Sequence, residues 1–152
     1  MKQFQFTLQK LKDFRGQELD RQKNALAVLR GDLSRIEEAH EELLKKVEQQ
    51  SEELTRVCSG GAAAHDIAVR KRYIVTLQQE IHLKEQQAEQ KKLEIEKQLG
   101  VVVEATKDVK TLEKLEEKQL EEYKISAGKE NEQFIEEFVS GQTVRAAMAA
   151  QQ

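Results

Sequence analysis

Residues 54–67 read LTRVCSGGAAAHDI, and the adjacent Gly60 and Gly61 form the strongest helix breaker in the chain. On either side of them, apolar residues recur at alternating steps of three and four, the spacing typical of a coiled-coil helix. A short connection between two helices makes them antiparallel neighbours. This stretch therefore predicts a turn at about residues 59–62, where the chain folds back on itself.

The first apolar stripe precedes the turn, and nine of its twelve positions are apolar. These positions are Leu19, Gln22, Leu26, Leu29, Leu33, Ile36, His40, Leu43, Val47, Gln50, Leu54 and Val57. Upstream, Phe4, Leu8 and Leu11 follow the same rhythm. The stripe predicts one helix from about residue 4 to residue 58.

The second stripe follows the turn and includes several polar positions. Its members are Ile67, Arg70, Ile74, Leu77, Ile81, Lys84, Ala88, Lys91, Ile95, Gln98, Val102, Ala105, Val109 and Leu112. After a shift of phase, the stripe continues through Leu115, Leu120, Tyr123, Ala127, Phe134 and Phe138. It predicts a longer helix from about residue 63 to residue 140, with Gly141 as its stop and a frayed tail at 142–152.

The glycines also set which residues face each other across the hairpin. A fold at Gly60 and Gly61 places Leu43 opposite Leu77, and it brings Gln22 to Gln98. Composition agrees with long helices that have one narrow apolar stripe. The 152 residues contain no proline, 35% of them are charged and only 38% are hydrophobic.

We predict an all-α fold, a long antiparallel two-helix coiled-coil hairpin with the second helix longer, in a single elongated domain over residues 1–152.

Bulk properties argue against several classes of protein. A net charge of −3 argues against nucleic-acid binding, which usually needs a basic surface. Cys58 is the sole cysteine, which excludes an intrachain disulfide framework. No apolar run approaches the roughly 18 residues of a membrane span, and no signal-peptide core is present, so we expect a cytoplasmic protein.

The sequence shows no constellation for catalysis. It lacks a phosphate-binding loop of the G-x-x-x-x-G-K-[ST] type. Glu37 and His40 have the spacing of a di-iron ligand pair, but such a site needs a second pair and two more carboxylates, so His40 is interpreted as a polar stripe residue. Cys58 lacks the electropositive surroundings of a reactive thiol, and the basic run Arg70-Lys71-Arg72 is interpreted as a solvated face. We therefore predict no enzyme activity, no cofactor and no metal.

The aromatic residues are the best candidates for partner contacts. Six of the seven lie near the two ends of the chain, which the antiparallel fold brings together at the open end of the hairpin. These six are Phe4, Phe6, Phe14, Tyr123, Phe134 and Phe138. Aromatic side chains are favoured anchors in protein interfaces, although these could instead pack on one another to hold the ends together. A second, weaker apolar patch toward the turn comprises Leu44, Val69 and Tyr73.

Two segments give the chain a resemblance to a known family. FQFTLQKLKDFRGQE at 4–18 and VKTLEKLEEKQLEEY at 109–123, followed by EQFIEEF at 132–138, resemble the FliJ family, the coiled-coil component of the bacterial flagellar type III export apparatus. The resemblance implies a non-enzymatic stalk that inserts into the hexameric export ATPase, promotes it, and links it to the membrane export gate and to export chaperones. It also implies a cytoplasmic protein, peripherally associated with the inner face of the cell membrane at the flagellar base, and we expect it to be monomeric.

The resemblance carries over to specific positions. The end facing the ATPase would comprise Phe4, Phe6, Leu8, Leu11, Phe14, Leu112, Leu115, Leu120 and Tyr123. The gate contact would fall on Tyr73 and Leu77, together with the nearby Leu44 and Val69. Other functions that fit the same pattern are a coiled-coil adaptor or chaperone without an ATPase partner, a ferritin-like metalloenzyme, and a peripheral membrane-binding protein with a basic amphipathic first helix.

Overall fold

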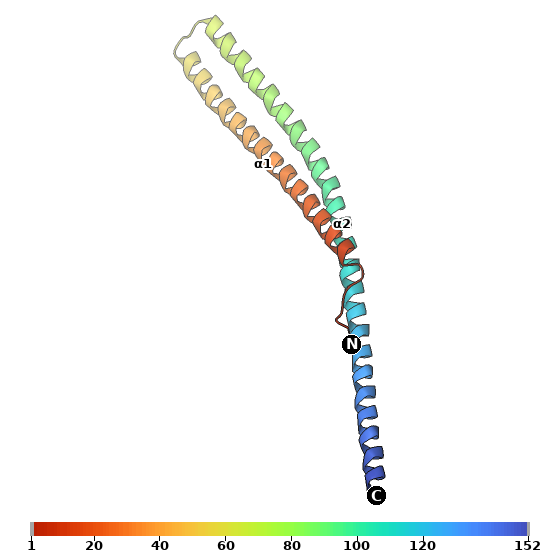
Figure 1. The fold of residues 1–152 in the computed structure, drawn as a ribbon. Helices are drawn as coiled ribbons and strands as arrows, with labels where there is room; N and C mark the ends of the chain where they lie inside the picture. Colours follow the sequence, from red (N-terminus) through yellow and green to blue (C-terminus); the bar gives the residue numbers. More distant parts are fainter. Residues whose placement is uncertain (1, 152) are drawn as a thin grey trace. The chain divides into compact units, whose positions relative to one another are not determined.

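The computed structural model describes residues 2–151, and among these it contains two α-helices and no strand. Helix α1 spans Gln9–Ser59 and helix α2 spans Ala64–Ala150, joined by a short turn (Figure 1). The predicted fold class is confirmed: an all-α antiparallel hairpin with a longer second helix. Its described residues form two compact units, Asp20–Glu104 (the turn unit) and the residues up to Leu19 with those from Ala105 onward (the terminal unit). That they form a single domain stays a prediction.

The turn is built by the backbone of the two glycines. The amide of Gly61 donates to the carbonyl of Cys58 (3.4 Å), and the amide of Ala62 donates to the carbonyl of Val57 (3.3 Å). This pair of bonds is the Schellman arrangement, which needs a left-handed residue just after the helix. Gly61 supplies it with a φ of 76°. The helix therefore ends here because glycine adopts this conformation without the clash that a Cβ would cause.

We expect Gly61→Ala to lower the free energy of unfolding by about 1–2 kcal/mol, because a Cβ is strained at this left-handed φ. Gly60→Ala is the matched control. A Cβ at Gly60 would lie 3.5 Å from the carbonyl of Arg56, an ordinary contact, so its effect should be close to zero. Urea titration followed by circular dichroism measures both. Equal losses would mean that the left-handed residue does not define the turn.

Within the turn unit, the two predicted stripes pack on each other. Every predicted stripe position from Gln22 to Val57 and from Ile67 to Val102 is buried or partly buried. Leu77 is the most buried of them, at 3% exposure. Off the stripes, Val28 and Leu44 are exposed. The core is thus a single seam between two helices, as the periodicity predicts.

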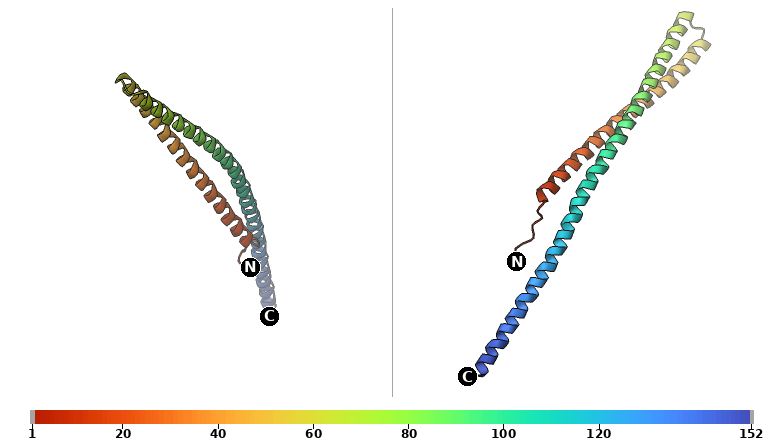
Figure 2. Two further views of the ribbon diagram at one scale, coloured as in Figure 1. Left: turned by 90° about the horizontal axis from the view of Figure 1, so that it is seen from above. Right: turned by 90° about the vertical axis from the view of Figure 1, so that its right-hand side faces the viewer.

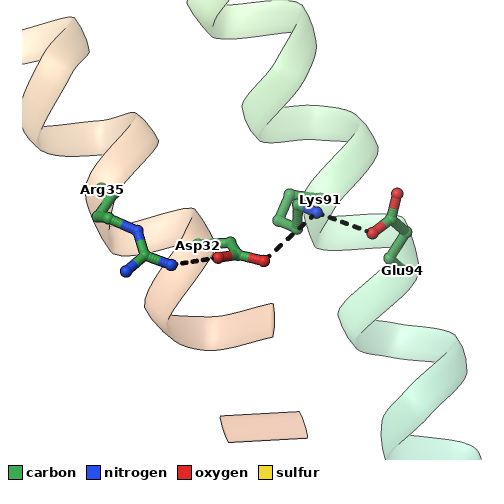
Figure 3. A network of polar contacts seen from close by, with 4 residues as sticks. All are labelled: Asp32, Arg35, Lys91 and Glu94. Carbon is green, nitrogen blue, oxygen red and sulfur yellow. Dashed lines mark hydrogen bonds and ion pairs between the residues drawn. The ribbon is translucent and has the colours of Figure 1, made fainter. Parts of the chain in front are cut away.

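Polar layers interrupt this seam and pin its register. The side-chain amide of Gln98 donates to the side-chain oxygen of Gln22 (2.8 Å) and to its backbone carbonyl (3.0 Å), which confirms the predicted pairing. Farther along, the Lys91 ammonium lies 3.8 Å from Asp32 and 3.0 Å from Glu94, and Arg35 also pairs with Asp32 (Figure 3). Gln22 and Gln98 are partly buried, so sliding the helices would cost them their mutual hydrogen bonds. The ion pairs around Asp32 are more exposed to water and contribute less to the register.

The start of the chain differs from the prediction. Residues 2–8, here called the N-terminal strap, are not helical, and α1 begins at Gln9 instead of near residue 4 (Figure 2). Phe6 is buried to 7% exposure, and its carbonyl accepts a hydrogen bond from the amide of Gln9 (3.1 Å). In a continued helix Phe6 would lie off the stripe. The backbone leaves helical geometry where this ring turns inward, because burying a phenyl side chain is strongly favourable.

The end of the chain also differs. Helix α2 continues through Gly141 to Ala150. The predicted stop at Gly141 is therefore wrong, and so is the predicted frayed tail over the described part of 142–152; residue 152 lies outside the described residues. Gly141 does not adopt a positive φ. Arg145 and the alanines from Ala146 to Ala150 are strong helix formers, and they outweigh the roughly 1 kcal/mol that one glycine costs. Neither helix, over its described residues, has the length and apolarity needed to cross a membrane.

Candidate functional site

Three of the predicted contact aromatics pack inside the terminal unit. The rings of Phe4 and Tyr123 lie with centroids 5.5 Å apart, tilted by 49°. The Tyr123 hydroxyl donates to the backbone carbonyl of Lys2 (2.7 Å), and Phe6 is buried. These rings therefore hold the strap against α2, which is the alternative role that the sequence left open for them.

Three other predicted residues remain on the surface of the same unit. Leu8, Leu11 and Phe14 are exposed by 37%, 40% and 54%, and we call them the exposed trio. Leu8 is the last residue of the strap, and its carbonyl accepts from the amide of Lys12 (2.9 Å), so it leads directly into the first turns of α1, where Leu11 and Phe14 follow at intervals of three residues. That spacing places them on one side of the helix. The Arg15 guanidinium lies 5.9 Å from the centre of the Phe14 ring.

The predicted residues on α2 lie behind this surface. Leu112 is buried, and Leu115 and Leu120 are partly buried. They form the layer on which α1 and the strap rest. Of the nine predicted residues, the structure thus gives the exposed trio a surface role and places the others in the packing beneath it.

Beyond Ala127, the α2 part of the terminal unit has no covered side chain. Its large apolar residues are all exposed by more than half. They are Phe134, Ile135, Phe138, Val139, Val144 and Met148. Phe134 and Phe138 were singled out from the sequence, whereas the exposed Val144 and Met148 were not, because that segment was predicted to fray. Exposed apolar side chains gathered in one segment are typical of a partner-binding surface.

Opposite charges join α1 to α2 in the terminal unit. The Lys12 ammonium lies 2.5 Å from a Glu116 carboxylate oxygen, and Arg15 lies 3.9 Å from Asp108. The hydrogen bond to Glu116 raises the pKa of Lys12 above its ordinary 10.5, helped by the nearby Glu113 and Asp13 carboxylates. The basic start of α1 is thus partly neutralised by acidic α2.

Lys12→Gln should destabilise the chain at neutral pH, and the difference from wild type should vanish in alkali. Because the folded-state pKa of Lys12 is raised, its contribution is fully present below the unfolded-state value and is lost as the pH rises through the folded-state value. Thermal melts from pH 7 to pH 11.5 measure the difference, with Lys10→Gln as an exposed control. A gap that persists unchanged above the folded-state pKa would contradict the role of the ammonium charge.

The patch predicted near the turn is only partly a surface. Leu44, Val69 and Tyr73 are exposed by 47%, 48% and 46%. Leu77 is buried in the seam at 3%, so its assignment to a surface contact is corrected: a stripe residue one turn after Tyr73 faces α1. Val69 and Tyr73 are one turn apart on α2, and Val69 borders a shallow surface hollow shared with His65 and Arg70.

The structure also shows the surroundings of His40, which has the spacing of one half of a di-iron ligand pair with Glu37. A polar hollow in the turn unit is lined by Glu37, His40, Lys84, Glu85, Ala88, Glu89 and Lys92. In it, a ring nitrogen of His40 lies 3.2 Å from Glu85, as expected for a polar residue in the seam. Among residues 2–151, no group of three or more His, Cys, Asp or Glu side chains is placed to hold a metal ion. The Cys58 thiol is free and exposed.

Comparison with known proteins gives one match. The family model described as "Flagellar FliJ protein" matches residues 4–147, nearly the whole chain. No curated protein and no solved structure matches the sequence.

Proposed function

The chain belongs to the FliJ family of flagellar proteins, and from this membership we propose that it is the non-enzymatic stalk of a flagellar export ATPase. Membership makes it a component of the flagellar export apparatus. The proposal goes further: the terminal unit inserts into the ATPase hexamer and promotes its activity. The observation that supports it most is the exposed apolar surface of that unit, which consists of the exposed trio at the start of α1 and the uncovered end of α2.

The physical fit of this surface supports the assignment. Between residues 128 and 150 the unit consists of one uncovered helix, and a single helix with its side chains is only about 10–12 Å wide. Such an element can enter a ring pore that would exclude a globular domain. Phe14, Phe134 and Phe138 then supply aromatic anchors of the kind that dominate interface energies.

We assign the other partners to the turn unit. The export gate, a membrane protein, would contact Leu44, Val69 and Tyr73, which are exposed there. Export chaperones are the other proposed partners, and they too would contact the turn unit. In this proposal the protein works as a monomer in the cytoplasm, and it reaches the inner face of the cell membrane only peripherally, through the gate.

Purified ATPase and purified chain test the proposal directly. We expect the chain to bind the hexamer and to stimulate ATP hydrolysis, with stimulation unaffected by Tyr73→Ala and Val69→Ala. These turn-unit variants should instead weaken binding to the cytoplasmic part of the gate protein. Stimulation that is lost in the turn-unit variants would reverse the assignment of the two ends.

A peripheral membrane protein is the second candidate, and the exposed trio beside Lys10 and Arg15 is the observation that favours it. The ion pairs of Lys12 with Glu116 and of Arg15 with Asp108 weigh against it, because they neutralise the charges that would attract an anionic surface. Flotation with vesicles of anionic lipid decides between the two. Strong flotation in the absence of any ATPase binding would favour the membrane.

A further inference from the structure

We infer that the N-terminal strap is a displaceable cover. It masks the first part of a partner-binding seam on α2, and the ATPase must displace it to bind along the full seam. This inference rests on the proposed function, since it takes the export ATPase as the partner. It concerns how that contact is regulated.

The covered part of the seam is defined by where α1 stops. Helix α1 begins only at Gln9, and Lys12 is already level with Glu116. Yet α2 stays partly buried for three further turns, at Gln119, Leu120, Tyr123 and Ala127. The strap covers this part of α2 at Tyr123, whose ring packs on Phe4 and whose hydroxyl donates to the carbonyl of Lys2.

The same seam continues beyond the strap. From Leu120, the apolar positions Tyr123, Ala127, Phe134 and Phe138 follow at steps of three, four, seven and four, the rhythm of a coiled-coil stripe. Ala127 is the last partly buried residue of α2, and Phe134 and Phe138 are 67% and 57% exposed. A partner helix that docks on the exposed half meets the strap as soon as it extends toward Leu120.

Charge indicates what kind of helix fits. Glu130 falls on the same stripe, three residues after Ala127 and four before Phe134. Further carboxylates lie close by at Glu132, Glu136 and Glu137, against the two lysines Lys124 and Lys129. Opposite charges flanking a helical seam set the choice of partner. The ATPase element that docks here is therefore an amphipathic helix with an apolar stripe and basic residues facing Glu130 and the carboxylates beside it.

The strap is held weakly enough to be displaced. Among the described residues its anchors are one buried ring, Phe6, one partly buried ring pair, Phe4 with Tyr123, and three hydrogen bonds. In these bonds the strap carbonyls of Lys2, Phe6 and Leu8 accept from Tyr123, Gln9 and Lys12, respectively. Ordering seven residues opposes these gains, and elements with few buried apolar contacts belong to the part of a structure that opens most readily. The strap contains neither proline nor glycine, so nothing prevents it from joining α1 once released.

Tyrosine fluorescence can follow release in the free protein. The chain has no tryptophan and two tyrosines, so in a Tyr73→Phe background Tyr123 is the only fluorophore of its kind. In that background, Phe6→Ala should raise the acrylamide quenching constant of Tyr123 about twofold, because an unanchored strap no longer shields the ring. The matched control is Gln5→Ala, an exposed neighbour that should change nothing. Unchanged quenching in Phe6→Ala would overturn the inference.

Binding to the ATPase tests the masking itself. If the strap covers the seam in most molecules, only the open fraction can bind, and the apparent affinity is lower than the intrinsic affinity by that fraction. Phe6→Ala should therefore bind the hexamer about tenfold more tightly than wild type or Gln5→Ala. Weaker binding of Phe6→Ala than of wild type would show that the strap is part of the contact. Equal binding would show that the strap masks nothing. Either result overturns this inference and leaves the proposed function standing. If none of the chains binds the ATPase, the proposed function is wrong and the regulation falls with it.

Discussion

Leu77→Ala is expected to be the most damaging truncation of a single side chain, lowering the free energy of unfolding by about 2–5 kcal/mol. Leu77 is the most buried of the core residues described, at 3% exposure. The loss combines the transfer free energy of the missing atoms with the cavity that they leave. Because a seam between two helices can partly collapse, we expect the lower end of this range.

Leu83→Ala provides the matched control for this prediction. It removes the same atoms from the same helix two turns away, but Leu83 is 51% exposed. Its effect should stay within about 0.5 kcal/mol, the usual range for surface substitutions. Urea denaturation followed by circular dichroism compares the two. Similar losses at both positions would mean that the face of α2 that packs on α1 has been assigned wrongly.

The combined change Leu8→Ala, Leu11→Ala and Phe14→Ala should remove most of the stimulation of ATP hydrolysis. These three side chains are 37%, 40% and 54% exposed, so their loss removes surface that a partner can touch, and we expect the fold to persist without them. If one of them is a hot spot of at least 2 kcal/mol, affinity for the hexamer falls by about 30-fold or more. Coupled ATPase assays and sedimentation with the hexamer measure both effects.

The control for the trio is an equal loss of exposed apolar surface from the turn unit. Val28→Ala, Leu44→Ala and Leu83→Ala together remove three large side chains that are 63%, 47% and 51% exposed. Helicity should be near wild type in both triple variants, and stimulation should survive only in the control. The opposite result would place the ATPase contact on the turn unit and refute the stalk arrangement proposed here.

The seam was predictable because one periodic signal determines it. Apolar residues at steps of three and four specify the buried face, and Gly60 and Gly61 fix the register, down to the bond between Gln22 and Gln98. The ends were not predictable in this way. Whether Phe6 continues a helix or turns inward depends on the surface of α2 that it meets, and Gly141 stops a helix only if its backbone becomes left-handed.

The candidate site shows the same division. Composition located the aromatic residues at the ends of the chain, and Phe14 is indeed exposed there. It could not separate Phe14 from Phe4 and Phe6, which are equally aromatic but pack within the chain. That distinction depends on three-dimensional packing in the strap, where no sequence period applies. Leu77 was assigned to a surface contact through the family resemblance, although its stripe position predicts burial, and the structure places it in the seam.

The thinness of the seam has a calorimetric consequence. No side chain among the described residues is less than 2% exposed, so every layer of the core already touches water in the folded state. Unfolding then adds less apolar hydration than it does in a globular domain, and apolar hydration is what raises the heat capacity. We expect the heat-capacity change of unfolding to lie below the usual value of roughly 12–15 cal/mol/K per residue. The free energy of unfolding should then vary little between low and physiological temperatures.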